Sequence, residues 1–188
     1  KQWSDFESDR DAVGVVSWLA THRTHFDYRM SVISKSGHQF RSQMKEFVEK
    51  GSSDGVLTTT VYSTERPKVC MVFPGQGQQW AYMGRQLYET EDVFKSSVDE
   101  CDQIFKKVSG WSLLNDEGLF AKSINGKVCN ADAVMNNLEV SQPAILFLQI
   151  AYAKLLQHWG IIPDVVVGHS LGEVAAAYVS GGMTLEES

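Results

Sequence analysis

Hydrophobic and polar positions follow two periods along this chain, one typical of helices and one typical of strands. Apolar residues spaced three and four apart predict helices at residues 9–22, 36–50, 91–108 and 142–159, and a shorter one near Gln86. Short apolar or β-branched runs predict strands at residues 26–34, 56–62, 68–73 and 164–167. A last helix is predicted at 173–179, directly after the fourth strand.

These elements fall into two regions that separate near Arg66 and Pro67. The pattern in residues 1–66 predicts a small α+β unit, in which no catalytic motif stands out. In residues 67–188 short buried strands alternate with helices, which is typical of an α/β domain with a parallel sheet. Two regions of different pattern therefore predict two domains.

The helix predicted at 142–159 is apolar on nearly every side, so we expect it to be buried. Pro143 is expected in its first turn and Gly160 just past its end, where each residue type is favoured. Near the end of the chain, Thr184 and Glu187 have the spacing of a capping box. In a capping box the side chain of each residue accepts a hydrogen bond from the backbone N–H of the other. Another helix is expected to begin there.

Composition narrows the possible partners. Of the 188 residues, 43% are hydrophobic and 21% are charged, which is typical of a globular domain. The net charge of −6 comes without a basic stripe, so neither nucleic acid nor a membrane is an expected partner. The cysteines Cys70, Cys101 and Cys129 are widely spaced and form no metal-binding motif, and they are expected to be reduced thiols in a cytoplasmic protein.

The pentapeptide GHSLG (168–172) has the G-x-S-x-G pattern of a nucleophile elbow. It follows an apolar strand and precedes a helix, which is the setting that such an elbow requires. A serine at this sharp turn holds its oxygen clear of the sheet, and the flanking glycines let strand and helix approach closely. Free N–H groups at the start of the helix would face a developing oxyanion. The alternative interpretation is a tight turn with a capping serine.

A second glycine turn, FPGQGQQW (73–80), follows the strand predicted at 68–73. Trp80 stands where a dinucleotide-binding loop needs its third glycine, so that interpretation fails. A loop that brings a backbone N–H close to a ligand fits better, since an oxyanion hole needs a second donor. An ordinary tight turn is the alternative.

Together with SQPA (141–144), and in this order, the two glycine motifs closely resemble the malonyl/acyl-CoA:acyl-carrier-protein acyltransferase family. The similarity runs from about Lys68 to the end. The segment RTHFDYRMSVIS (23–34) resembles the linker between ketosynthase and acyltransferase in type I synthases.

The resemblance implies a parallel-sheet, α/β-hydrolase-like acyltransferase core, truncated, at 67–188, and a small α+β linker domain at 1–66. The parent would be a type I polyketide synthase or fatty acid synthase, and FPGQGQQW is more similar to the polyketide enzymes.

The resemblance also implies residue roles. Ser170 would be the nucleophile that accepts the acyl group, and the backbone N–H groups of Gln76 and Leu171 would form the oxyanion hole. Further substrate-binding positions implied around the nucleophile and in the glycine turn are Gly75, Gly77, Gln142 and His169. Gln142 would help to order the site, and His169 would shape the acyl pocket.

The implied reaction is ping-pong transfer of a malonyl-type group from CoA to the phosphopantetheine of an acyl carrier protein. A ketosynthase domain of the same chain would be a further partner. The resemblance implies no metal and no bound cofactor, because the CoA thioester is a substrate.

The general base of this family lies in a later segment than the nucleophile, and His169 points elsewhere because it adjoins the serine. The other histidines are expected to be structural: His22, His25, His38 and His158. The catalytic histidine and the carboxylate-binding arginine are therefore expected beyond Ser188. The isolated chain is expected to turn over poorly and to fold incompletely.

Two other functions stay open. A serine hydrolase or thioesterase shares the nucleophile elbow, although the GQG turn and SQPA favour a transferase. The chain could also act only as a linker and docking fragment, without catalysis of its own.

Overall fold

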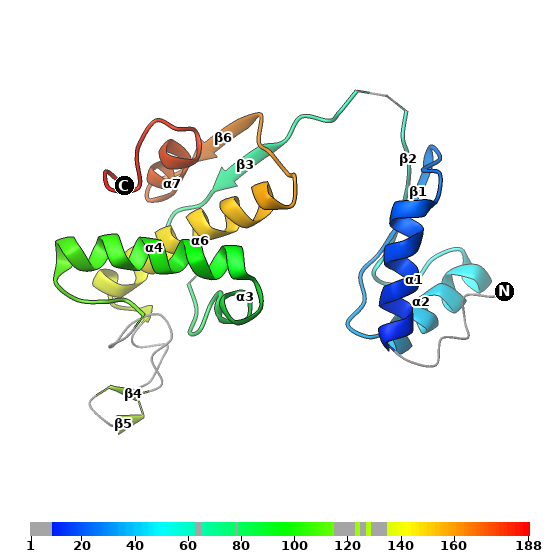
Figure 1. The fold of residues 1–188 in the computed structure, drawn as a ribbon, viewed down its shortest axis with the longest axis horizontal. Helices are drawn as coiled ribbons and strands as arrows, with labels where there is room; N and C mark the ends of the chain where they lie inside the picture. Colours follow the sequence, from blue (N-terminus) through cyan, green and yellow to red (C-terminus); the bar gives the residue numbers. More distant parts are fainter. Residues whose placement is uncertain (1–8, 63–64, 78, 115–122, 125–126, 129–134) are drawn as a thin grey trace. The chain divides into compact units, whose positions relative to one another are not determined.

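The computed structural model describes residues 9–62, 65–77, 79–114, 123–124, 127–128 and 135–188. It divides into two compact units, Lys1–Arg66 and Pro67–Ser188, and each is described by itself (Figure 1). Within the described residues, no helix combines the length and the apolar character needed to cross a membrane.

The described residues of the first unit form two helices and one antiparallel strand pair: α1 (Asp9–His22), β1 (Tyr28–Val32), α2 (Gly37–Lys50) and β2 (Val56–Thr60). The Ser36 hydroxyl accepts a hydrogen bond from the Gln39 N–H at the start of α2, and Gly51 ends that helix with a φ of 77°. The four elements predicted here are confirmed. Both strands are shorter than predicted, because pairing runs only from Tyr28 opposite Thr60 to Val32 opposite Val56.

A buried glutamine ties this unit together. The Gln43 amide on α2 donates hydrogen bonds to the carbonyl oxygens of Ile33 at 3.0 Å and Asp54 at 2.8 Å. These two carbonyls lie just after β1 and just before β2, so a single side chain links the helix to the ends of both strands. The sequence pattern did not predict this role, because Gln43 is polar within an otherwise ordinary amphipathic helix.

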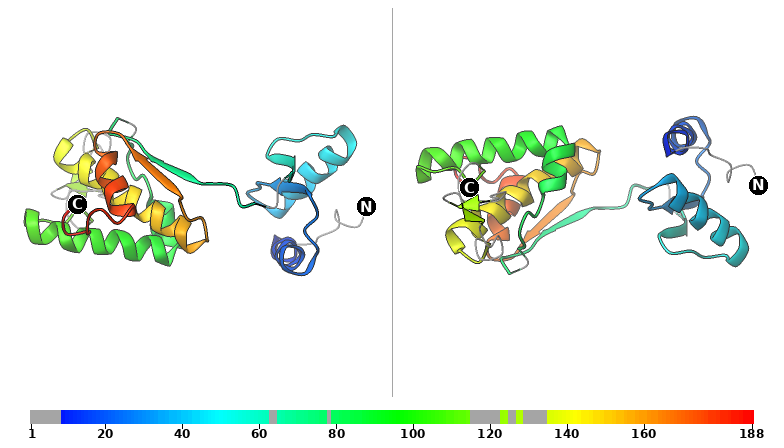
Figure 2. Two further views of the ribbon diagram at one scale, coloured as in Figure 1. Left: turned by 90° about the horizontal axis from the view of Figure 1, so that it is seen from above. Right: turned by 90° about the horizontal axis from the view of Figure 1, so that it is seen from below.

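The second unit is an α/β arrangement in which β3 and β6 form a parallel sheet and β4 and β5 form a separate antiparallel pair. Its elements are β3 (Cys70–Phe73), α3 (Arg85–Thr90), α4 (Asp92–Ser109), β4 (Ser123–Ile124), β5 (Lys127–Val128), α6 (Leu138–His158), β6 (Val165–Gly168) and α7 (Gly172–Val179). Strands β3 and β6 pair in parallel, with Cys70 opposite Val165 and Phe73 opposite Gly168. Helix α7 packs against both strands, and α6 contacts α4 and α7 (Figures 1 and 2).

The larger hydrophobic core lies where α4 meets α6. Six of its residues have no exposed surface: Phe94, Val98, Leu113, Ala144, Ile150 and Ala151. A smaller cluster joins Met71 and Phe73 of β3 to Ala153 of α6 and Ala175 of α7. The prediction of a buried, nearly all-apolar helix is thus confirmed for α6, which packs against α4 and contributes Ala153 to the smaller cluster.

One detail of α6 was predicted wrongly. The helix begins at Leu138, because the Asn137 side chain caps it by accepting a hydrogen bond from the Glu139 N–H at 3.0 Å. Pro143 therefore lies inside the helix rather than in its first turn. At that position proline lacks the N–H that would bond the carbonyl of Glu139. An asparagine cap four residues before the SQPA motif was the signal that the pattern analysis missed.

The capping box predicted near the end of the chain is present. The Thr184 N–H donates to the Glu187 carboxylate at 2.9 Å, and the Glu187 N–H donates to the Thr184 hydroxyl at 3.3 Å. The structure describes the residues between them as a turn. The reciprocal bonds hold this turn closed.

Candidate active site

Ser170 occupies the sharp turn between β6 and α7, and its backbone has a φ of 53°. This left-handed conformation is uncommon for a residue other than glycine, and it costs conformational energy. A strained serine between a strand and a helix is the defining feature of a nucleophile elbow. The observed turn therefore matches the interpretation drawn from GHSLG, although the role of Ser170 as nucleophile stays a prediction.

The two glycines of the elbow are required by close backbone packing. A Cβ added to Gly168 would lie 2.4 Å from the carbonyl oxygen of Gly172, and one added to Gly172 would lie 2.1 Å from the carbonyl oxygen of Phe73. Real Cβ atoms do not approach backbone atoms so closely. The strand, the elbow and the helix thus fit together only without side chains at these two positions.

The turn after β3 lies directly beside the elbow, because β3 and β6 run parallel and end together. The His169 N–H donates to the Phe73 carbonyl oxygen at 3.0 Å. A Cβ added to Gly75 would lie 3.3 Å from the Cβ of Ser170 and 3.2 Å from the His169 ring. The structure therefore brings together two motifs that are far apart in the sequence.

Several backbone N–H groups at this junction have no acceptor among the described residues, and those of Gln76 and Leu171 are among them. One belongs to the turn beside Ser170, and the other immediately follows Ser170. Free donors beside a nucleophile are what an oxyanion hole requires. The predicted assignment of these two groups is consistent with the geometry and stays a prediction.

Side chains of α6 hold the β3 turn from the other side. The Gln142 amide donates to the side-chain oxygen of Gln76 at 3.0 Å. Two turns later on the helix, the Gln149 amide donates to the Pro74 carbonyl oxygen at 2.6 Å. Sequence analysis singled out Gln142 and missed Gln149. A polar residue seven positions after Gln142, on the same face of an otherwise apolar helix, was the available signal.

Gly77, another predicted site residue, lies further along the same turn. Its φ of 124° lies in the region that favours glycine, and its N–H donates to the Gln79 side chain at 2.8 Å. The Gln79 amide in turn reaches the carbonyl of Met135 at 3.5 Å. These contacts give Gly77 a part in shaping the turn, whereas Gly75 is the glycine that packs against the elbow.

Two histidines, His158 and His169, lie in this unit. His169 is exposed and adjoins the serine, and His158 lies in the last turn of α6. Neither histidine forms a hydrogen bond with Ser170 in the described part. In the first unit, the rings of His22 and His25 contact backbone carbonyls of Trp18 and Ala20. Those contacts agree with the structural roles expected for them.

A cysteine also lies near the site but is poorly suited to nucleophilic attack. Cys101 lines a cavity of about 320 Å³ together with Gln142 and Leu171. Its thiol is buried, and burial raises its pKa to about 12. A thiol reacts as the thiolate, so Cys101 stays protonated and unreactive at neutral pH.

We therefore expect Cys101 to resist alkylation by iodoacetamide at pH 7.5 in the folded protein. Peptide mass spectrometry after digestion would measure its modification. The same treatment in denaturant is the control, in which Cys101 should be modified fully. Rapid labelling of the native protein at Cys101 would contradict the buried, protonated thiol.

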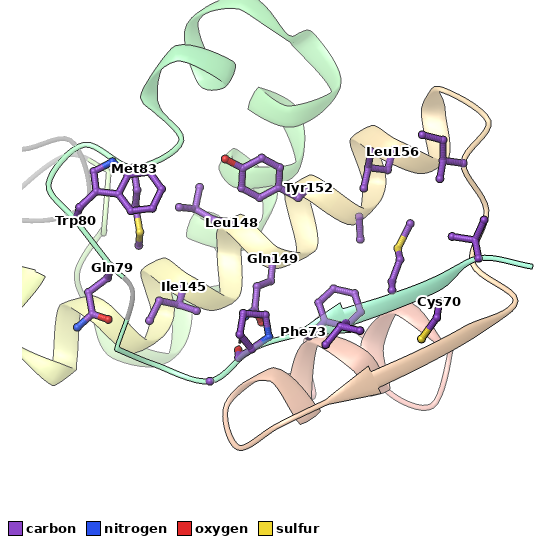
Figure 3. Close-up of a pocket in the computed structure, with 17 residues that line it drawn as sticks. Cys70, Phe73, Gln79, Trp80, Met83, Ile145, Leu148, Gln149, Tyr152 and Leu156 are labelled. Atoms are coloured by element: carbon purple, nitrogen blue, oxygen red, sulfur yellow. Dashed lines mark hydrogen bonds between the residues drawn. The ribbon is translucent and has the colours of Figure 1, made fainter. Parts of the chain in front are cut away.

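An apolar groove of about 510 Å³ runs between α6 and β3 (Figure 3). Phe73, Ile145, Leu148 and Tyr152 contribute to its walls, and Gln149 points from α6 into it toward the turn after β3.

Among the described strands, β3 pairs only with β6, and Val72 on β3 is 68% exposed. No group of His, Cys, Asp or Glu in the described residues is arranged to hold a metal ion.

Comparison with known proteins gives the family of this chain. The family described as "Acyl transferase domain" matches residues 70–188. Probable polyketide synthase 1 of Dictyostelium discoideum is 35% identical over 169 residues, covering 90% of this chain and 5% of that protein. The pikromycin polyketide synthase component PikAIII of Streptomyces venezuelae is 32% identical over 188 residues, covering 99% of this chain and 11% of that protein.

Solved structures agree with these relatives. The acyl transferase domain of ZmaA has a TM-score of 0.75 at 32% identity, covering 88% of this chain and 36% of that one. The acyltransferase domain from module 8 of the salinomycin polyketide synthase has a TM-score of 0.75 at 27% identity, covering 98% of this chain and 41% of that one. This chain therefore spans less than half of each solved domain.

The chain belongs to the acyl transferase domain family. Its relatives and structural neighbours place it, more narrowly, in the acyltransferase domain of a type I polyketide synthase. The α/β fold with a parallel sheet, inferred from the alternation of strands and helices, is confirmed. Of the two synthase classes expected from the sequence, the polyketide synthases are the ones that these comparisons support.

Proposed function

We propose that the complete domain moves a malonyl-type acyl group from CoA to the phosphopantetheine of an acyl carrier protein, through an ester on Ser170. The observation that carries the proposal is the strained serine turn, with its φ of 53°, packed against the turn that follows β3. The match to the acyl transferase family supports it. The elbow alone would serve hydrolysis equally well.

In the first half-reaction the Ser170 hydroxyl oxygen bonds to the thioester carbonyl carbon while a base removes its proton. The carbonyl oxygen becomes an oxyanion that accepts hydrogen bonds from the N–H groups of Gln76 and Leu171. The carbon–sulfur bond then breaks, and CoA leaves as the thiol with the proton returned by the base. Each donor to such an oxyanion contributes about 10²–10³ in rate.

The second half-reaction repeats these events with the phosphopantetheine thiol as the attacking group. Its sulfur bonds to the acyl carbon, the ester bond to Ser170 breaks, and the serine recovers its proton. We place the general base in the part of the domain that this chain does not span, since neither His158 nor His169 bonds Ser170 in the described part. We also place there the arginine that would bind the carboxylate of the substrate.

We further propose that residues 1–66 link this domain to a ketosynthase domain in the same protein. The family match begins at residue 70, whereas the similarity to the pikromycin synthase component covers 99% of the chain. The first unit thus has counterparts in a polyketide synthase outside the acyl transferase family match. Its segment at 23–34, which suggested a linker, forms β1 and its flanks.

The test that separates a transferase from a hydrolase or thioesterase is the fate of the acyl-enzyme. The full-length protein is incubated with malonyl-CoA and, in parallel, with methylmalonyl-CoA, and intact mass is followed over time. We expect an adduct that persists in buffer and moves to phosphopantetheinylated carrier protein when that is added. An adduct that hydrolyses at the same rate without the carrier protein would establish a hydrolase instead.

The 188-residue chain alone provides a second arm of the same experiment. We expect it to show no turnover, because no histidine among its described residues is hydrogen-bonded to Ser170. Turnover by this chain at the rate of the full-length protein would show that the base lies within it. A chain that acted only as a linker would give no adduct in either form.

A further inference from the structure

The side-chain amide of Gln149 forms a hydrogen bond through its nitrogen but none through its oxygen. Its Nε2 donates to the Pro74 carbonyl oxygen at 2.6 Å, while its Oε1 is buried and has no partner among the described residues. The residues around it on α6 are mainly apolar, and the groove that it lines is apolar as well. A buried amide oxygen without a partner costs stability, which an aliphatic side chain here would avoid. Packing therefore does not explain a glutamine at this position.

The carbonyl that Gln149 holds belongs to the peptide unit between Pro74 and Gly75. This unit is planar, so fixing its oxygen also fixes the direction of the Gly75 N–H. Gly75 itself has no side chain to restrict its backbone, and the next N–H along the chain is that of Gln76. On the far side of Gly75, the Gln142 amide holds the Gln76 side chain at 3.0 Å. The flexible glycine is thus anchored on both sides by two glutamines from one helix.

We propose that Gln149 is a positioning residue, which orients the Gln76 N–H toward the oxyanion by holding the Pro74–Gly75 peptide against α6. The inference rests on the proposed function, because it assumes that Gln76 is an oxyanion donor. The effect of Gln149 is indirect, so its loss should matter less than loss of the donor. It should also act on the transition state rather than on binding of the thioester.

The test is single-turnover acylation of the full-length protein by malonyl-CoA and methylmalonyl-CoA, measured by rapid quench and intact mass. Gln149→Leu and Gln149→Met each remove the donor with little change in size. We expect each to lower the limiting acylation rate by about tenfold, compared with about 10²–10³ for deletion of an oxyanion donor. The half-saturating thioester concentration should change by less than about twofold, because no ground-state contact is lost.

Gln157→Leu is the matched control, since Gln157 lies on the same helix and its side chain takes part in no hydrogen bond within the described residues. Thermal unfolding of all variants shows whether each is folded at the assay temperature. Acylation by folded Gln149→Leu and Gln149→Met at the wild-type rate would overturn the inference, as would an equal loss in Gln157→Leu. If the wild-type protein forms no adduct while remaining folded, the proposed function itself fails, and the two failures are thereby distinguished.

Discussion

Ser170→Ala is expected to abolish the acyl adduct and to lower acyl transfer by about four orders of magnitude or more. The substitution removes the oxygen that forms the ester and leaves the flanking turn in place. Because Ser170 is held in a left-handed conformation by the packing of Gly168 and Gly172, alanine should adopt the same backbone. Intact mass after incubation of the full-length protein with malonyl-CoA would measure the loss.

Ser180→Ala is the matched control for this substitution. Ser180 lies at the exposed C-terminal end of α7, where its hydroxyl bonds the carbonyl of Ala177 at 2.9 Å. We expect its adduct and transfer rate to equal those of the wild-type protein. An adduct of undiminished amount on Ser170→Ala would show that another residue carries the acyl group, and the nucleophile assignment would be wrong.

Gly172→Ala should have the second largest effect, on both stability and activity. Its Cβ would lie 2.1 Å from the oxygen and 2.6 Å from the carbon of the Phe73 carbonyl, so α7 and β3 must move apart. Backbone atoms give way less easily than a flexible side chain, and we expect a cost of about 3 kcal/mol. The same movement separates Ser170 from the turn after β3. A misplacement of about 1 Å lowers rates by about 10²-fold, which acylation kinetics would detect.

Gly14→Ala is the control that shows whether the effect of Gly172→Ala depends on close packing. Gly14 lies within α1, and a Cβ there would meet no atom within 4 Å. Alanine favours a helix over glycine, so this change should leave acylation unaltered and raise the stability of the first unit slightly. Wild-type melting and acylation in Gly172→Ala would contradict the contact on which the prediction depends.

Most elements of the fold could be predicted because their causes are local. Helix α2 begins after a capping serine at Ser36 and ends before Gly51, and both signals are visible in the sequence. The elbow could be predicted for the same reason, since strand, GHSLG and helix are contiguous. Helix α6 was predicted to be buried from its apolar composition alone. Its first residue was placed wrongly because Pro143 was given more weight than the cap at Asn137.

The contacts that could not be predicted join residues distant in sequence. The bond from Gln149 to Pro74 spans 75 positions, and no periodicity within either segment indicates it. The same holds for the meeting of Gly75 with Ser170, which depends on the parallel register of β3 and β6. Sequence motifs supplied the candidate residues of the site. Their arrangement follows from pairing between strands, and a residue such as Gln149 is found only once that pairing is known.

The pairing of β3 with β6 also has a consequence for how the protein folds. The side chain of Asp164, just before β6, accepts a hydrogen bond from the Val69 N–H, and these two residues are 95 positions apart. Contacts of such long range form slowly, because the intervening chain must lose its freedom before they contribute. We therefore expect the elbow and the turn after β3 to come together late in folding. During synthesis on the ribosome, Ser170 can meet the Gln76 N–H only after β6 has emerged from the exit tunnel and paired with β3.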